Sequence, residues 1–384
     1  MDGLITHADL HTPGRHVSDA CLEIRDGRIF AIHEAADSPP DLPVLLDAEG
    51  RRTLPGFVDI HTHGAMGRDV CDGEPDALTT IAKAKIREGV TTFLPTTLTI
   101  AQDALRKIVE MAAPYMASPT FAKAPRLHIE GPYINRNCVG AQNPEFVRPP
   151  DAKEIRALHA ISPIGIVSLA PETEGGLAFI EEMKSMGIVT SMAHTAATYA
   201  QFLAARKAGA THLTHYCNQM TPLHHREIGL VGAALLDDDV RIETICDTIH
   251  LCPEMITLTF KHQSINQMML ITDSMPASWM PDGPYELAEM KVQVKNGEAR
   301  LESGALAGST LRYHHGLKNV HEITKIPLEE LTRASGYNQA QSLGLAGIGE
   351  IVPGNPADIV ILDDAFEPVA VFVDGEDKLP QAVV

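Results

Sequence analysis

Positively charged residues are scarce in this sequence. Lys and Arg together number 31 against 50 Asp and Glu, which gives a formal net charge of −19 at neutral pH and an isoelectric point near 5.3. This balance argues against nucleic acid and an anionic membrane surface as general partners, because both would repel the protein. A negatively charged small-molecule substrate therefore needs a local cationic pocket.

Targeting and disulfide signals are also absent. No stretch approaches the ~20 apolar residues that a membrane-spanning helix needs, and the N-terminus lacks a basic region followed by an apolar run. The six cysteines form no Cys-x-x-Cys pair and no regular framework, as expected of reduced thiols: Cys21, Cys71, Cys138, Cys217, Cys246 and Cys252. We therefore predict a cytoplasmic protein.

Aromatic residues make up only 5% of the 384 residues, but 44% are hydrophobic, so the chain can bury a large core. A barrel-sized domain with an appendage fits this length better than three small domains. From about residue 55 onward, short β-rich runs alternate with longer helix-like segments. Eight runs are predicted strands: 56–61, 90–96, 126–131, 164–171, 188–194, 211–216, 240–246 and 269–274.

Segments with helical spacing lie between these runs, for example 77–89, 101–116, 151–161 and 199–210. Gly89 and Gly209 stand where a glycine that ends a helix is expected. Eight such units predict an α/β fold, a (β/α)₈ TIM-type barrel, whose chemistry gathers at the C-terminal ends of its strands.

Both ends of the chain differ from this pattern. Residues 3–34, 44–54 and 350–376 read as turn-rich strands, with a hairpin turn at Asp26-Gly27. They predict a small β-sandwich domain built from both termini. We expect segments 1–54 and 346–384 to form this domain and 55–345 to form the barrel, with an excursion at 278–303 that contains a hairpin at Asn296-Gly297.

The motif Pro-Gly-Phe-Val-Asp-Ile-His-Thr-His-Gly, residues 55–64, ends a buried strand with two histidines. Residues i and i+2 of a strand point to the same side, so His61 and His63 present two imidazoles together. Neutral imidazole is the commonest metal ligand near pH 7. The alternative is a pair of loop histidines bonded to water or backbone.

Polar side chains of the same kind stand at the ends of several predicted strands: His61 and His63, Glu130, His194, His215 and Asp273. Taken singly, a histidine is more often a bonded core group, and an aspartate before Ser274 is compatible with a helix cap. Six of them around one rim predict a catalytic site for zinc or another borderline divalent metal. Glu130 has two oxygens to bridge two ions, and Asp273 is placed to accept a proton from water and deliver it to a leaving amine.

The surrounding sequence resembles the N-acetylglucosamine-6-phosphate deacetylase family of the amidohydrolase superfamily through most of the chain. Segments 55–64, 127–147, 191–199, 211–235, 246–255, 270–277 and 306–310 carry this resemblance. The Glu-Gly-Pro run at residue 130 and the run from His215 to Glu227 are the most specific. His-x-His and Thr-Asp alone indicate only the superfamily.

The resemblance implies roles for the rim residues. Glu130, His194 and His215 match the principal metal ligands, Asp273 matches the general acid/base, and His61 with His63 match a second metal position. Some relatives lack both of these histidines and use one ion. One or two divalent ions per subunit are therefore expected, zinc first, with iron, manganese or cobalt as alternatives.

The resemblance also implies substrate contacts at Ala141, Gln142, Asn218, Gln219, Arg226, His250, Leu306, Ala307 and Gly308. Arg226 offers a bidentate fork for phosphate, and the alternative is a surface salt bridge with Glu227. In the family this arginine can reach across a dimer interface, which implies a homodimer. Gln142 stands where some members place a carbonyl-polarising histidine, and Asn218-Gln219 replaces a common Asn-Ala pair.

The expected reaction is metal-dependent hydrolysis of the N-acetyl group of N-acetyl-D-glucosamine 6-phosphate to glucosamine 6-phosphate and acetate, in amino-sugar catabolism or recycling. Alternative substrates are N-acetylgalactosamine 6-phosphate, an N-acyl amino acid or a cyclic amide. A third hypothesis is a non-catalytic scaffold. It requires a broken ligand set, whereas none of the six rim positions is missing.

Overall fold

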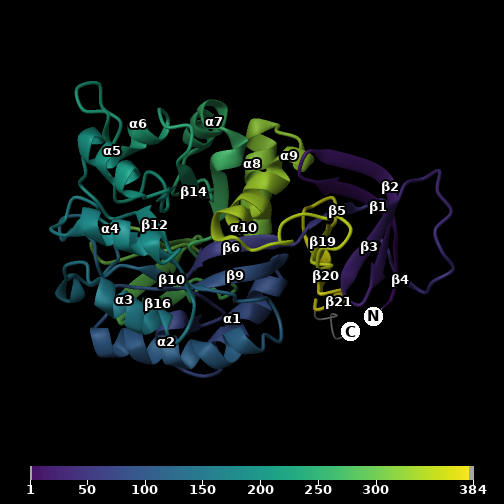
Figure 1. Ribbon diagram of the computed structural model, residues 1–384, viewed down its shortest axis with the longest axis horizontal. Helices are drawn as coiled ribbons and strands as arrows, with labels where there is room; N and C mark the ends of the chain where they lie inside the picture. The colour runs from purple at the N-terminus through teal and green to yellow at the C-terminus, as the bar shows by residue number, and fades with distance from the viewer. Residues whose placement is uncertain (1, 380–384) are drawn as a thin grey trace.

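The structure is a computed structural model that describes residues 2–379. Figure 1 shows a larger body, in which helices surround strands, beside a smaller body of strands that holds both ends of the chain. Within the described residues, no helix combines the length and the apolar character that crossing a membrane requires.

Eight parallel strands form the centre of the larger body, one at each of the eight predicted positions. They are hydrogen-bonded in the order in which they occur along the chain. An isolated parallel bridge between Thr62 and Ser274 joins the end of the first strand to the residues after the last. The predicted (β/α)₈ barrel is confirmed, with the strands β6 (Phe57–Thr62), β9 (Val90–Thr97), β10 (Leu127–Glu130), β11 (Ile164–Leu169), β12 (Val189–Met192), β13 (His212–Leu213), β14 (Arg241–Ile245) and β15 (Met268–Ile271).

Helices cover the outside of the barrel (Figure 1). The four helices predicted as examples are confirmed as α1, α2, α3 and α5, and Gly209 caps the last of them with a φ of 127°. The strands are buried on both faces, β6 over all six residues, because the helices shield one face and the barrel interior the other. The helices are α1 (Ala77–Ile86), α2 (Gln102–Ala117), α3 (Ala152–His159), α4 (Gly176–Ser185), α5 (Tyr199–Ala208), α6 (Gly229–Ala234), α7 (Pro253–His262), α8 (Tyr313–Thr324), α9 (Leu328–Thr332) and α10 (Asn338–Leu343).

The smaller body is the β-domain built from both termini that we predicted as a sandwich, and its strands are hydrogen-bonded into a single sheet. Strand β5 pairs with β19 and so joins the two ends of the chain, and a core of its own includes Ile5, Leu22 and Ile359. The domain boundaries after residues 54 and 345 remain our proposal. The eight strands form one sheet: β1 (Gly3–Thr12), β2 (Arg15–Arg25), β3 (Arg28–His33), β4 (Val44–Asp47), β5 (Arg52–Pro55), β19 (Ile359–Leu362), β20 (Pro368–Val373) and β21 (Glu376–Asp377).

The predicted excursion after the eighth barrel strand is a three-stranded antiparallel sheet. It consists of β16 (Gly283–Leu287), β17 (Met290–Lys295) and β18 (Glu298–Arg300). The hairpin at Asn296-Gly297 is confirmed, because Lys295 pairs with Glu298. A two-stranded ribbon of β7 (Gly64–Ala65) and β8 (Arg68–Asp69) follows the first barrel strand.

A buried ion cluster lies where the first and last barrel strands meet. Lys85 of α1 is fully buried, and its Nζ is 3.1 Å from Asp59 Oδ2 and 3.1 Å from Glu88 Oε2. The same ammonium donates to Thr272 Oγ1 at 3.1 Å and to Ser274 Oγ at 2.9 Å. The cluster therefore holds both neighbours of residue 273 against strand β6.

We predict that Lys85→Met destabilises the protein by about 3–5 kcal/mol, because it leaves two buried carboxylates without a compensating charge. Urea unfolding measures this loss. Lys107→Met, on the exposed face of α2, is the matched control and should leave the free energy of unfolding unchanged. Equal stability of the two variants would contradict a structural role for the cluster.

Candidate metal centre and active site

Three rim residues share a strained backbone conformation at the point where their strands end. His194, His215 and Asp273 each lie two residues beyond β12, β13 and β15, with φ angles of 44°, 32° and 51°. Non-glycine residues rarely adopt this left-handed region, and such strain concentrates at functional sites. For Asp273, hydrogen bonds to the backbone of His61 (2.9 Å) and Ser309 (2.7 Å) hold the conformation.

Glu130, His194 and His215 converge on one point. Glu130 Oε1 lies 3.2 Å from His194 Nε2 and 3.0 Å from His215 Nε2, and the two Nε2 atoms are 3.2 Å apart. All three side chains are buried in the barrel. Three nitrogen and oxygen donors at this spacing, on rigid strand ends, fit a divalent cation with an open coordination position.

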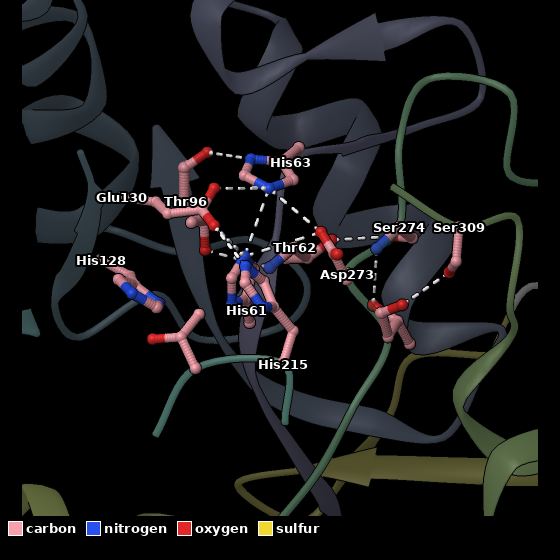
Figure 2. A network of polar contacts seen from close by, with 12 residues as sticks. His61, Thr62, His63, Thr96, His128, Glu130, His215, Asp273, Ser274 and Ser309 are labelled. Carbon is pink, nitrogen blue, oxygen red and sulfur yellow. Dashed lines mark hydrogen bonds and ion pairs between the residues drawn. The ribbon is translucent and has the colours of Figure 1, made fainter. Parts of the chain in front are cut away.

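A second set of donors stands beside the first, and Figure 2 shows His61, His63 and Asp273 close to Glu130 and His215. His61 Nε2 and His63 Nε2 are 3.2 Å apart, and Asp273 Oδ1 is 3.1 Å from the latter. Glu130 faces both sets, because its other oxygen, Oε2, lies 3.3 Å from His63 Nε2. The arrangement matches a carboxylate shared between two cation positions.

The outer nitrogens of the histidines set their tautomers. Nδ1 of His63 donates to the carbonyl oxygen of Thr96 at 3.1 Å, and Nδ1 of His194 donates to that of Cys138 at 2.8 Å. Nδ1 of His61 donates to Glu243 Oε2 at 3.0 Å. Because Nδ1 keeps its proton, a metal ion that took the place of the proton on Nε2 would meet the tautomer that a metal ligand requires.

Electrostatics at the site favour a cation. Burial disfavours the charged imidazolium of His63, but hydrogen bonds to Asp273 and Glu130 outweigh it and raise the pKa of His63 to about 9. Burial likewise opposes ionisation of Asp273, yet the neighbouring imidazoles lower its pKa to about 2. Asp273 is therefore a carboxylate at neutral pH and can accept a proton.

A cavity of about 190 Å³ opens at this rim. Five of the six rim residues line it, and His61 lies buried behind His63. Among the predicted substrate contacts, seven line the cavity: Ala141, Gln142, Asn218, Gln219, His250, Leu306 and Gly308. Ala307 is buried beside them, whereas Arg226 lies exposed on the segment after β13, outside the lining, with its Nη1 2.7 Å from His225 Nε2.

Two lining residues have defined partners. Gln142 donates from Nε2 to Glu130 Oε2 at 2.7 Å and accepts from the Thr99 backbone at 2.6 Å, so one amide hydrogen is already committed. His250 donates from Nδ1 to Asp247 at 2.7 Å. Burial opposes the charged form of His250, but Asp247 outweighs it and raises the pKa of His250, which favours positive charge beside the cavity.

Two charged residues of this region were not predicted: Glu243, which contacts His61, and Lys85, which contacts Thr272 and Ser274 on either side of Asp273. Both are fully buried. The available signals were a glutamate in the centre of the apolar strand 240–246 and a lysine on the apolar face of the helix 77–89. A buried charge requires a partner, but the sequence does not say which one.

Comparison with known proteins confirms the family resemblance predicted from the sequence. The family model described as "Amidohydrolase family" matches residues 53–377. The chain belongs to the amidohydrolase family. This family is metal-dependent, as the donor set of the site leads one to expect.

Individual members of the amidohydrolase family are similar along most of their length. The chain is 36% identical to N-acetylglucosamine-6-phosphate deacetylase of Lysinibacillus sphaericus over 83% of each chain. It is also 36% identical to N-acetylgalactosamine-6-phosphate deacetylase of Escherichia coli O157:H7, over 94% of this chain and 95% of that one. The solved structure of N-acetyl-D-glucosamine-6-phosphate deacetylase from Mycobacterium smegmatis, a mutant in complex with N-acetyl-D-glucosamine-6-phosphate, superposes with a TM-score of 0.93 at 29% identity, over 99% of this chain and 100% of that one.

We predict that Glu130→Gln removes bound metal, because both donor sets share this carboxylate and an amide supplies no negative charge. Metal content per chain after dialysis measures the loss. Glu145→Gln, an exposed residue of the same loop region, is the control and should retain metal. Full metal content in the Glu130 variant would show that the carboxylate is not a ligand.

Proposed function

We propose that this protein hydrolyses the N-acetyl group of N-acetyl-D-glucosamine 6-phosphate, releasing acetate and glucosamine 6-phosphate. The observation that carries the proposal is the Asp273 carboxylate beside two histidine sets that share Glu130, in a cavity of a chain similar to deacetylases of this kind. The scaffold hypothesis needs a broken ligand set, and this set is complete.

The reaction divides between the metal site and the residues around it. Divalent ions held by the rim residues would supply a Lewis acid and lower the pKa of water. Asp273 accepts the proton of the attacking water through its carboxylate and then delivers it to the amine nitrogen as the C–N bond breaks. The second amide hydrogen of Gln142 is available to the acetyl oxygen, where negative charge develops.

The nature of the ions is part of the proposal. We propose one or two divalent ions per chain, zinc first, since imidazole and carboxylate donors serve zinc, iron, manganese and cobalt alike. Glu130, His194 and His215 would hold the first ion and His61 with His63 the second, with Glu130 between them. Cysteine usage supports a cytoplasmic location, where amino sugars are broken down or recycled.

Recognition of the phosphate is proposed to involve two copies of the chain. His250 lines the cavity, but Arg226 projects from an exposed segment outside the lining. We propose a homodimer in which Arg226 of one copy completes the phosphate site of the other. Exposed Leu223 on the same segment would be covered by such an interface.

N-acetylgalactosamine 6-phosphate is the second candidate substrate. The chain is 36% identical to a deacetylase of that sugar phosphate, the same identity as to the first relative. Gln219, whose side chain lies against Gly140 and lines the cavity, adds bulk to one wall. The two sugars differ only in the orientation of one hydroxyl group, which such a wall residue can distinguish.

Acetate release from metal-loaded protein tests the reaction. We predict the highest kcat/KM with N-acetylglucosamine 6-phosphate, compared with its unphosphorylated and galacto counterparts. Asp273→Asn should lower kcat by at least ~10²-fold while metal content is retained, because an amide cannot accept the proton. Near-normal turnover by this variant would refute the role of Asp273, and faster release from the galacto substrate would favour the second candidate.

Arg226→Ala tests the phosphate site. We predict that kcat/KM for the phosphorylated substrate falls by about 10- to 100-fold, since charge-assisted hydrogen bonds contribute ~1.5–3 kcal/mol. Hydrolysis of the unphosphorylated sugar is the internal control and should not change. Sedimentation of the wild-type protein reports the dimer, and a monomer with full activity would rule out completion of the site by a second copy.

A further inference from the structure

Glu243 is a buried carboxylate that the reaction outlined above does not use. It lies on strand β14 in the barrel interior with no exposed surface. Its Oε2 accepts the Nδ1 hydrogen of His61 at 3.0 Å, and on the far side of that ring Nε2 is 3.2 Å from His63 Nε2. Glu243, His61 and the second donor set therefore form one line of contacts.

The other histidines of the site are supported differently. His63 and His194 donate from Nδ1 to neutral backbone carbonyls, and Nδ1 of His215 has no hydrogen-bond partner among the described residues. Of these four imidazoles, only His61 has a carboxylate behind it. A carboxylate that accepts the outer N–H makes an imidazole a stronger metal ligand than a carbonyl does.

His128 does not compete for Glu243, although its ring packs at 4.7 Å from that of His61 and the three side chains lie close enough to resemble a metal site. Nδ1 of His128 donates to the carbonyl of Ile60 at 2.9 Å, and Nε2 accepts from Ser168 Oγ at 2.7 Å. Both ring nitrogens are occupied, so this trio offers no free lone pair from His128. The cluster is a support for His61.

Glu243 also has few hydrogen-bond partners. Its Oε1 is buried without a hydrogen-bond partner among the described residues, and its second Oε2 contact is a long one of 3.4 Å from the backbone of His215. Buried carboxylate oxygens normally have hydrogen-bond partners, and the short contact that Glu243 makes is the one to His61. This contact holds the ring with Nε2 turned toward the second donor set.

We propose that Glu243 is the positioning residue that gives the His61–His63 position its own divalent ion, and so decides whether the chain holds one ion or two. The inference rests on the proposed metal site. It assigns the two positions unequal support: His194 donates to a backbone carbonyl and Nδ1 of His215 has no partner among the described residues, whereas His61 donates to a buried carboxylate on another strand.

Zinc binding at equilibrium tests this role. Wild-type protein, Glu243→Gln and Glu23→Gln are dialysed against zinc at several free concentrations set by a chelator, and zinc is counted per chain. Glu23 is the matched control, a buried carboxylate in the β-domain whose Oε2 contacts His33 Nε2 at 2.9 Å, far from the barrel rim. Wild-type protein and Glu23→Gln should bind two ions.

Glu243→Gln should bind one ion with unchanged affinity and the second about 10- to 100-fold more weakly. His61→Gln removes the ligand itself and should give one ion. Adding Glu243→Gln to it should change nothing further, a result that a general loss of stability would not produce. If Glu243→Gln melts at a lower temperature, the double variant still separates the loss of the second ion from a general loss of stability.

Two ions of unchanged affinity in Glu243→Gln, or equal loss of both ions, would overturn the inference. So would a wild-type chain that takes up only one ion at every free zinc concentration. Acetate release by the same wild-type sample is measured separately. Activity with a single ion would leave the proposed deacetylation intact while removing the role assigned to Glu243.

Discussion

Closure of the barrel between its first and last strands is the constraint on which the site depends. Strands β6 and β15 meet at the Thr62–Ser274 bridge, and the buried Lys85 ammonium compensates Asp59 and Glu88 at the same seam. A buried charge is tolerated only when its partners surround it closely, so this cluster allows little displacement of either strand. His61, His63 and Asp273 all project from this seam. The interaction that closes the fold therefore also sets the distances between Asp273 and the two histidines.

The rim collects negative charge in a place from which water is largely excluded. Glu130 and Asp273 are both buried, and burial alone would favour their neutral forms. Instead, the facing imidazoles hold the pKa values of Glu130 and Asp273 below their ordinary range. The same negative potential favours metal cations over bare protons when both compete for the Nε2 atoms. The pairs of carboxylates and imidazoles that stabilise the rim are therefore the same groups that are available to bind metal.

The site combines residues at rigid strand ends with residues on loops. Donor atoms come from strand ends held by the barrel, whereas the wall beside Gln219 comes from the loop after β13 and Arg226 lies on an exposed part of that segment. Active sites of (β/α)₈ barrels commonly divide in this way, with chemistry on the strands and specificity on the loops. Substitutions in the loops therefore alter the preferred sugar more readily than the reaction.

The sequence was enough to predict the eight alternating strands, the β-domain from both termini, and the rim residues. These features follow from local periodicity, and a strand end fixes where its side chain lies once the barrel is assumed. The groups that hydrogen-bond to the rim residues and to their neighbours could be identified only in the folded chain. His61 meets Glu243 across 182 positions of the chain, and Lys85 meets Thr272 across 187. No local pattern encodes such pairings, because burial tells only that a charge needs a partner, whereas the closed barrel selects which partner it contacts.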